Sequence, residues 1–244
     1  MSARLLPVLP GVMQIRGGIV NCYLIADADG LVLIDAGMRA DMRCILQAID
    51  ASGRALRDLR LILITHADGD HVGCAAQLLA AARAVGGAAR LCVPAGEAAS
   101  LAAGKSSREL RAHGLLKVAL QLTAKLWAFK PLEFDATLAD GELLPVLGGL
   151  RVLNTPGHTP GHCSFYADGL GLLFAGDAFK NFGGRLQVSD GINTWDECAA
   201  LHSATRLSAL APAVICMGHG PVVQDAAPAM QRVVMAHKLR LETG

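Results

Sequence analysis

Three absences narrow the classes of protein that this sequence of 244 residues can encode. No stretch holds the roughly 18 uninterrupted apolar residues that a membrane-spanning helix needs. The formal net charge is only +1, so no broad surface for nucleic acid or for an anionic membrane is indicated. The seven cysteines contain no Cys-x-x-Cys pair, and an odd number of them does not suit a disulfide framework.

The location and organisation of the chain follow from what remains. Residues 1–7 lack the apolar core of a secretory signal, and unpaired cysteines suit a reducing compartment, so we expect a cytoplasmic protein. Hydrophobic residues make up 52% of the chain, which is ample for a core. No internal repeat or low-complexity linker interrupts it. We therefore predict one α/β domain over residues 1–244.

The segment 65–73 carries the strongest chemical signal. It places four potential metal ligands within six residues: His66, Asp68, Asp70 and His71. They follow the apolar run 61–64, which predicts a buried strand. Because a buried charge must be paired or must coordinate a metal, the segment predicts a metal site. Imidazoles and carboxylates together suit zinc, iron or manganese.

Three later apolar runs also end in a residue that can ligate a metal. These ligands are His158 after residues 150–153, Asp177 after 172–174 and His219 after 214–217. Neighbouring glycines let the backbone approach a bound ion closely. In α/β sheets the carboxyl ends of the strands are where sites are usually built. We therefore expect all four segments to deliver their ligands to one rim of the fold.

Strand and helix signals alternate along the chain. Residues 20–25 and 31–34 flank a turn at 27–30 and predict a hairpin. A short strand is expected at 91–94. Apolar residues at helical spacing, or flanking glycines, predict helices over residues 39–52, 73–85, 195–208 and 227–241.

In order and context, these motifs resemble the metallo-β-lactamase fold superfamily. The resemblance covers residues 12–222 and includes an early strand ending in Asp35-x-Gly37. It implies a four-layer αββα sandwich, with a helical insertion before the second metal motif. It also implies two adjacent divalent metal ions with a bridging hydroxide, zinc being the metal expected first. The implied ligands are His66, Asp68 and His158 for the first ion, Asp70, His71 and His219 for the second, and Asp177 as the bridge.

The sequence departs from the family pattern at Asp68, where the common motif has a histidine. The flavodiiron branch of the superfamily also has a carboxylate here, so the change does not imply an inactive site. Aspartate is shorter and harder than imidazole and adds a negative charge. Iron or manganese therefore become more plausible as the bound metal, as does a site with only one position filled.

The resemblance implies a metal-dependent hydrolase in which a metal-bridging hydroxide cleaves an ester, thioester or lactone bond of a small molecule. Asp70 is the expected proton acceptor or donor for the leaving group. Lys180 stands where related lactonases carry a tyrosine, and it either contacts the substrate or is a surface lysine. Two alternatives stay open: an iron-dependent redox enzyme acting on oxygen or persulfides, and a non-catalytic, metal-stabilised binding protein.

The insertion at about residues 96–135 crowds leucines and basic residues into a helical stretch. We expect a lid over a substrate with an apolar portion. The alternatives are a packing or homodimer contact and, less in keeping with the pattern, a helix on a membrane surface.

Several further residues carry expectations of their own. Asp35 should orient a metal-ligating histidine. His162 is either a partner of a ligand or a loop cap. His113, His202 and His237 match no motif and are expected to be exposed.

Overall fold

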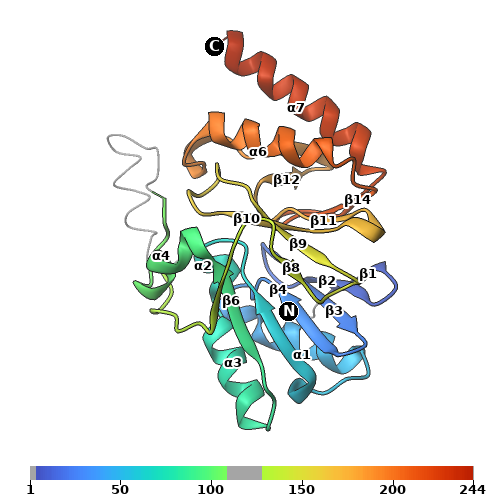
Figure 1. The fold of residues 1–244 in the computed structure, drawn as a ribbon, viewed down its shortest axis with the longest axis vertical. Coiled ribbons are helices and arrows are strands. Elements are labelled where there is room, and N and C mark those ends of the chain that lie inside the picture. The colour runs from blue at the N-terminus through green and yellow to red at the C-terminus, as the bar shows by residue number, and fades with distance from the viewer. Residues whose placement is uncertain (1–3, 109–127, 244) are drawn as a thin grey trace. The chain divides into compact units, whose positions relative to one another are not determined.

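A computed structural model gives the fold of the chain over residues 4–108 and 128–243 (Figure 1). The chain groups into two compact units. The first comprises Met1–Ser106 and Trp127–Leu138, and the second comprises Ser107–Leu126 and Ala139–Gly244. Each unit is built around one main sheet and carries part of the predicted ligand set.

The first unit contains a seven-stranded sheet in which strand order follows chain order. Its strands are β1 (Arg4–Leu9), β2 (Val12–Arg16), β3 (Asn21–Asp27), β4 (Gly30–Ile34), β5 (Leu59–Leu63), β6 (Arg90–Pro94) and β7 (Ala136–Leu138). Short turns join β1 to β4 in antiparallel order. From β4 to β7 the pairing is parallel, which requires longer crossover connections.

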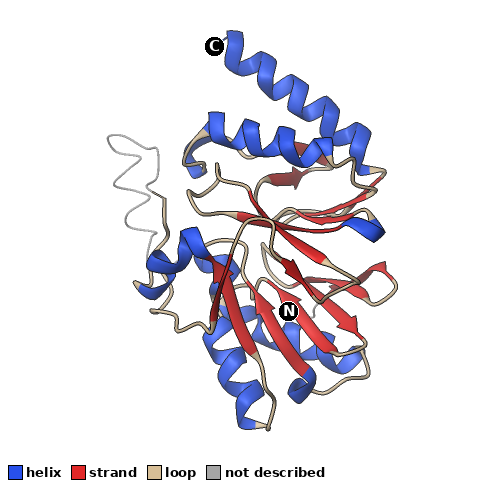
Figure 2. Ribbon diagram, viewed as in Figure 1, coloured by secondary structure: helices blue, strands red, loops and turns tan. Residues whose placement is uncertain are grey.

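Helices supply crossovers between the parallel strands of the first unit. They are α1 (Met42–Ala51), α2 (Gly69–Val72), α3 (Ala75–Ala84) and α4 (Ala98–Ala102), with 3-10 turns at Arg39–Asp41, Leu56–Asp58 and Ala95–Glu97. The apolar stripes of α1 and α3 belong to one buried cluster with the strands, so both helices cover the same face of the sheet (Figure 2).

The second unit contains a six-stranded sheet and a separate hairpin. The sheet order is β15-β14-β11-β10-β9-β8, and the hairpin pairs β12 with β13. The strands are β8 (Leu143–Leu144), β9 (Leu150–Asn154), β10 (Cys163–Ala167), β11 (Leu172–Phe174), β12 (Phe179–Phe182), β13 (Arg185–Val188), β14 (Val214–Cys216) and β15 (Val223–Gln224).

Two helices pack on the second unit's core. They are α6 (Glu197–Ala209) and α7 (Ala226–Thr243), with 3-10 turns at Asp168–Leu170 and Gly191–Asn193. Ala204 and Leu207 of α6 and Met230 of α7 share a buried cluster with residues of β11, β12 and β14. This packing fixes both helices against strands whose ends carry the predicted ligands.

The predicted hairpin and helices are confirmed, with boundaries shifted by a few residues. The predicted 73–85 helix corresponds to α3, with the short helix α2 just before it, and the predicted 195–208 helix begins at Glu197. The crowded helical stretch of the insertion lies largely at 109–127, outside the described residues, so its role stays a prediction. Among helices of the described chain, none is long and apolar enough to cross a membrane.

Candidate functional site

Parallel pairing of β4 with β5 brings Asp35 beside the predicted ligand segment of the first unit. Each strand ends at the same edge, because Ile34 lies opposite Leu63 in the register. Asp35 adopts a left-handed backbone conformation with φ of 58°, which aspartate tolerates better than most residues. The buried Asp35 carboxylate accepts the backbone N–H of Thr65 at 2.9 Å. This hydrogen bond fixes the Asp35 carboxylate next to the histidines of the ligand segment.

The Asp35 carboxylate sets the orientation of two histidine rings. Asp35 Oδ2 lies 2.8 Å from Nδ1 of His71, and a carboxylate only accepts, so His71 donates from Nδ1. Thr65 Oγ1 donates its one proton to the same carboxylate, at 2.9 Å. That hydroxyl must therefore accept from His66 Nδ1, which lies 2.9 Å away. Both neutral imidazoles thus keep the Nε2 lone pair for a metal.

Buried donor atoms of the first unit face one another at spacings suited to metal ligation. His66 Nε2 lies 3.6 Å from Asp68 Oδ2, and His71 Nε2 lies 4.0 Å from Asp70 Oδ2. Two ligands each about 2.1 Å from a tetrahedral zinc lie about 3.4 Å apart. The first unit therefore brings together His66, Asp68, Asp70 and His71 as a nitrogen and oxygen donor set that fits a divalent metal.

The Asp35 contacts predict a clear effect on metal binding. In Asp35→Asn the amide cannot accept both hydrogen bonds as a carboxylate does, so the His71 ring loses its fixed orientation. We expect zinc affinity to fall about 10- to 100-fold. The measurement is zinc titration against a competing chelator, with the exposed Asp29→Asn as control. Equal affinities for the two variants would contradict the orienting role of Asp35.

Two further side chains contact the ligand segment of the first unit. Ser106 Oγ donates to Asp68 Oδ1 at 2.7 Å. The backbone N–H of Ala67 donates to Oε2 of the buried Glu97 at 3.2 Å. Neither Ser106 nor Glu97 belongs to a recognisable motif, because each lies far along the chain from the residue that it contacts. Glutamate is usually exposed, so nothing in the sequence marked Glu97 as a buried residue.

In the second unit, one carboxylate oxygen faces two histidines. Because β11 and β14 pair in parallel, Asp177 and His219 emerge at the same edge of the sheet. Asp177 Oδ2 lies 3.1 Å from His219 Nε2 and 3.6 Å from His158 Nε2. The three predicted ligands of this unit are therefore brought together, with the aspartate between the two imidazoles.

The loop that carries His158 rests on the start of helix α6. The N–H groups of Trp195 and Asp196 each donate at 3.0 Å, to the carbonyls of His158 and Gly157 respectively. A Cβ added to Gly157, whose φ is +146°, would lie 2.3 Å from the backbone of Ala200. Only glycine lets the loop approach the helix this closely.

Polar side chains of the second unit form hydrogen bonds with the predicted ligands His158 and Asp177. Ser189 Oγ lies 3.2 Å from Nδ1 of His158. His162 Nε2 accepts the backbone N–H of Asp177 at 3.0 Å. Its Nδ1 lies 2.8 Å from Thr155 Oγ1, to which the neutral ring donates. His162 is thus a partner of the ligand segment.

Large apolar side chains lie exposed next to two predicted ligand histidines of the second unit. The Phe182 ring stacks on His219, with centroids 6.1 Å apart and planes 26° apart. Phe182 is nevertheless 54% exposed, and Trp195, whose backbone contacts His158, is 42% exposed. Such surface is available to contact another molecule.

Lys180, predicted to contact substrate, lies in an ion-pair cluster on the second unit. Its Nζ lies 2.5 Å from Asp190 Oδ1, and Arg240 bonds the other oxygen at 3.0 Å. Burial alone would raise the pKa of Asp190, but the hydrogen bond and charge of Lys180, with Arg240, lower it below its usual value. The catalytic role of Lys180 stays a prediction.

His237 corrects one expectation. It is 7% exposed rather than open to solvent, because α7 packs this side chain against its own unit. Burial lowers the pKa of the imidazole, and the nearby Arg240 guanidinium lowers it further. His202 is exposed as expected, and His113 lies outside the described residues.

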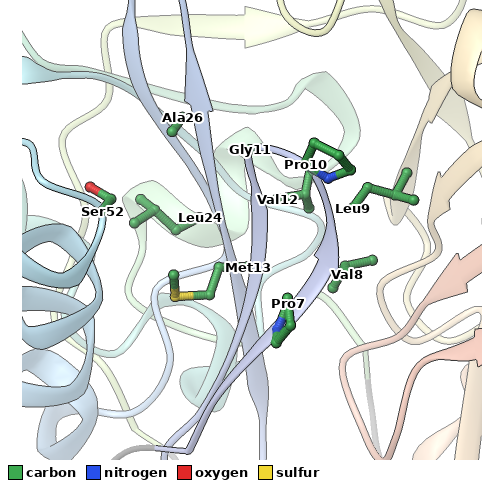
Figure 3. Close-up of a pocket in the computed structure, with 10 residues that line it drawn as sticks. All are labelled: Pro7, Val8, Leu9, Pro10, Gly11, Val12, Met13, Leu24, Ala26 and Ser52. Atoms are coloured by element: carbon green, nitrogen blue, oxygen red, sulfur yellow. The ribbon is translucent and has the colours of Figure 1, made fainter.

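The first unit contains a hollow of about 590 Å³. Figure 3 shows the residues that line it. Its lining is apolar apart from Ser52, and comprises residues 7–13 with Leu24, Ala26 and Ser52. In the sheet register Ala26 lies opposite Leu31, near the start of β4, whereas Asp35 follows the end of that strand. The hollow therefore lies at the opposite edge of the sheet and carries no chemistry.

Comparisons with known proteins show the family to which the chain belongs. The family model described as the metallo-beta-lactamase superfamily matches residues 15–219. The protein YobT of Bacillus subtilis is 32% identical over 228 residues, which cover 90% of this chain and 91% of YobT. A metallo-beta-lactamase family protein of known structure from Thermus thermophilus is 28% identical with a TM-score of 0.69, over 96% of this chain and 81% of that one.

A hydroxyacylglutathione hydrolase of Cereibacter sphaeroides is also similar, at 32% identity over 180 residues. The match covers 72% of this chain but only 52% of the hydrolase, so the chain spans about half the length of that relative. The chain belongs to the metallo-β-lactamase superfamily, and its α/β fold is of the metallo-β-lactamase type. The predicted family and fold class are thereby confirmed.

Proposed function

We propose that this protein is a metal-dependent hydrolase that cleaves an ester, thioester or lactone bond. The observation that carries the proposal is the position of Asp177 Oδ2, which faces Nε2 of both His158 and His219. A carboxylate oxygen shared by two imidazoles suits a ligand that bridges two ions. Membership of the superfamily and the similarity to a protein named as a hydrolase support the same class.

The proposed metal centre uses the ligand set that the superfamily pattern implies. We assign His66, Asp68 and His158 to one ion, Asp70, His71 and His219 to the other, and Asp177 to both. When bound, divalent metals make hydroxide available near neutral pH and stabilise a developing oxyanion. The nitrogen and oxygen donor set suits zinc first, and the carboxylate of Asp68 keeps iron and manganese as alternatives.

Two side chains are assigned roles toward the substrate. Asp70 is proposed to hold the proton that passes to the leaving group, since a carboxylate can both accept and return it. Lys180 is proposed to bind a substrate carboxylate or carbonyl in exchange for Asp190. That exchange would leave Asp190 paired with Arg240, so no carboxylate would lose all its charge partners.

We propose that the substrate carries an apolar portion. The exposed rings of Phe182 and Trp195 support this, since each belongs to a segment that contacts a ligand histidine. Binding an apolar group there would remove large aromatic surfaces from water, which is favourable. A small-molecule substrate is proposed, and no observation favours nucleic acid. A cytoplasmic location is also proposed, supported by seven cysteines that are all free thiols.

The proposed function is tested by metal content and by turnover. Protein purified without added metal or chelator is expected to hold about two zinc or manganese ions per chain by inductively coupled plasma mass spectrometry. It should then hydrolyse members of a panel of esters, thioesters and lactones, with longer acyl chains turned over at lower KM. A single iron per chain, with oxygen uptake and no hydrolysis, would replace the proposal by the redox alternative.

A further inference from the structure

The carboxylate of Asp68, the one residue that departs from the family motif, has two oxygens in different surroundings. Ser106 Oγ donates to Oδ1 at 2.7 Å. The other oxygen, Oδ2, lies 3.6 Å from His66 Nε2, too far for a hydrogen bond but suited to two ligands of one ion. Oδ1 thus accepts a hydrogen bond from Ser106, while Oδ2 faces the predicted ligand His66.

An aspartate at this position poses a problem that a histidine does not. A metal-binding imidazole presents one nitrogen to the metal, and a partner on its other nitrogen fixes the ring. A carboxylate has two equivalent oxygens and a broad torsional preference at χ2, so either oxygen or both can bind a metal. Asp68 therefore needs a partner on one oxygen before it can act as a defined ligand.

We infer that Ser106 is a positioning residue that holds Asp68 as a one-oxygen ligand of the metal bound by His66. This inference rests on the proposed metal centre. The carboxylate oxygen accepts this hydrogen bond, so the Ser106 hydroxyl is the donor. Both side chains are shielded from solvent, Asp68 being 7% exposed and Ser106 partly buried, which strengthens a charge-assisted hydrogen bond.

The segment that carries Ser106 is itself fixed against the metal loop. Glu97, immediately before α4, accepts from the backbone of Ala67, and Ser106 follows α4 by four residues. The carbonyl of Leu101 within α4 accepts the N–H of Leu132, which ties the helix to a second part of the first unit. The segment 97–106 therefore contacts the loop on either side of α4, and the serine is presented from a supported backbone.

The first experiment measures zinc binding to the full chain after chelator treatment. Ser106→Ala is expected to weaken one of two zinc sites about 10- to 100-fold and to leave the other unchanged. Ser106→Thr should keep the wild-type affinity, whereas Ser106→Val, matched to it in shape, should not. Ser100→Ala is the control, a partly buried serine on α4 of the same unit. Unchanged zinc binding in Ser106→Ala and Ser106→Val would overturn the inference.

The second experiment asks whether the hydroxyl acts through Asp68. In an Asp68→His background, Ser106→Ala should no longer alter zinc affinity, because the carboxylate that it holds is absent. Such non-additivity is the signature of two residues acting as a pair. An equal loss in both backgrounds would overturn the inference, since the serine would then act on the local fold. A chain that binds zinc normally but hydrolyses no substrate overturns the proposed function alone.

Discussion

Asp70→Asn is expected to lower kcat/KM for every active substrate by about 10²- to 10⁴-fold, the range ascribed to general acid–base catalysis. Asp70 is buried on the short helix α2, with Oδ2 4.0 Å from His71 Nε2. Asparagine keeps the shape of the side chain but cannot accept and return a proton, and its neutral oxygen is a weaker metal ligand. Steady-state kinetics across the substrate panel measures the effect.

The control for Asp70→Asn is Asp50→Asn, an exposed aspartate on α1 of the same unit. It should retain wild-type kinetics. Metal content measured on the same preparations separates a lost proton carrier from a lost ligand. Undiminished hydrolysis in Asp70→Asn, with the substitution verified by mass spectrometry, would rule out the proposed mechanism.

Gly220→Ala is expected to destabilise the protein strongly, because the added methyl group has no room. Gly220 follows His219 with φ of +90°, and an added Cβ would lie 1.8 Å from the carbonyl oxygen of Asn181. The Asn181 N–H donates to the His219 carbonyl at 2.9 Å and its side chain donates to the Pro221 carbonyl at 3.2 Å, so Asn181 cannot move away independently.

The expected loss in unfolding free energy is roughly 3 kcal/mol, combining about 1–2 kcal/mol for a left-handed alanine with the cost of overpacking. For a chain of this size it corresponds to a Tm lower by about 6–12 °C. Gly183→Ala is the matched control, since Gly183 has φ of +60° but no atom within 4 Å of the position that an added Cβ would occupy. Equal Tm values for the two variants would show that the close approach to Asn181 is not what constrains Gly220.

The ligand-bearing strands could be predicted because burial and chemistry coincide in their sequence. The apolar run 61–64 corresponds to β5, and the runs before Asp177 and His219 correspond to β11 and β14. Each run is short, continuous and closely followed by a glycine or a ligand, the pattern of a strand buried on both faces. The parallel pairing of β11 with β14 then places their two ligands at one edge, as expected of such sheets.

The elements that sequence reasoning missed have weaker or mixed patterns. Strand β1 contains Pro7, which cannot donate to a ladder and is tolerated because β1 is an edge strand. The β12–β13 hairpin alternates poorly, although the Gly183-Gly184 pair was a turn signal. Helix α6 starts at Glu197 rather than at Trp195 because the Asp196 side chain caps it by accepting from Ala199 N at 2.8 Å.

The contacts that support the ligands could not be read from spacing. Ser106 and Ser189 reach Asp68 and His158 from loops distant in sequence, and serine is common enough to carry no signal by itself. Only the chain path determines which serine meets which ligand. Asp35 was predictable because it ends a strand within a recognised motif, and its bond to His71 bears out the expected orienting role.

The packing of the His158 loop against α6 lowers the entropy cost of binding at His158. The loop is bonded at the carbonyls of Gly157 and His158 and is pressed against Ala200 through a glycine, so its backbone freedom is already lost when the second unit folds. Whatever this histidine binds does not have to order the loop as well. The affinity of His158 for a bound group is therefore higher, because the entropy cost of ordering the loop is met when the protein folds. Loosening the first turn of α6 would weaken binding even though every ligand atom is still present.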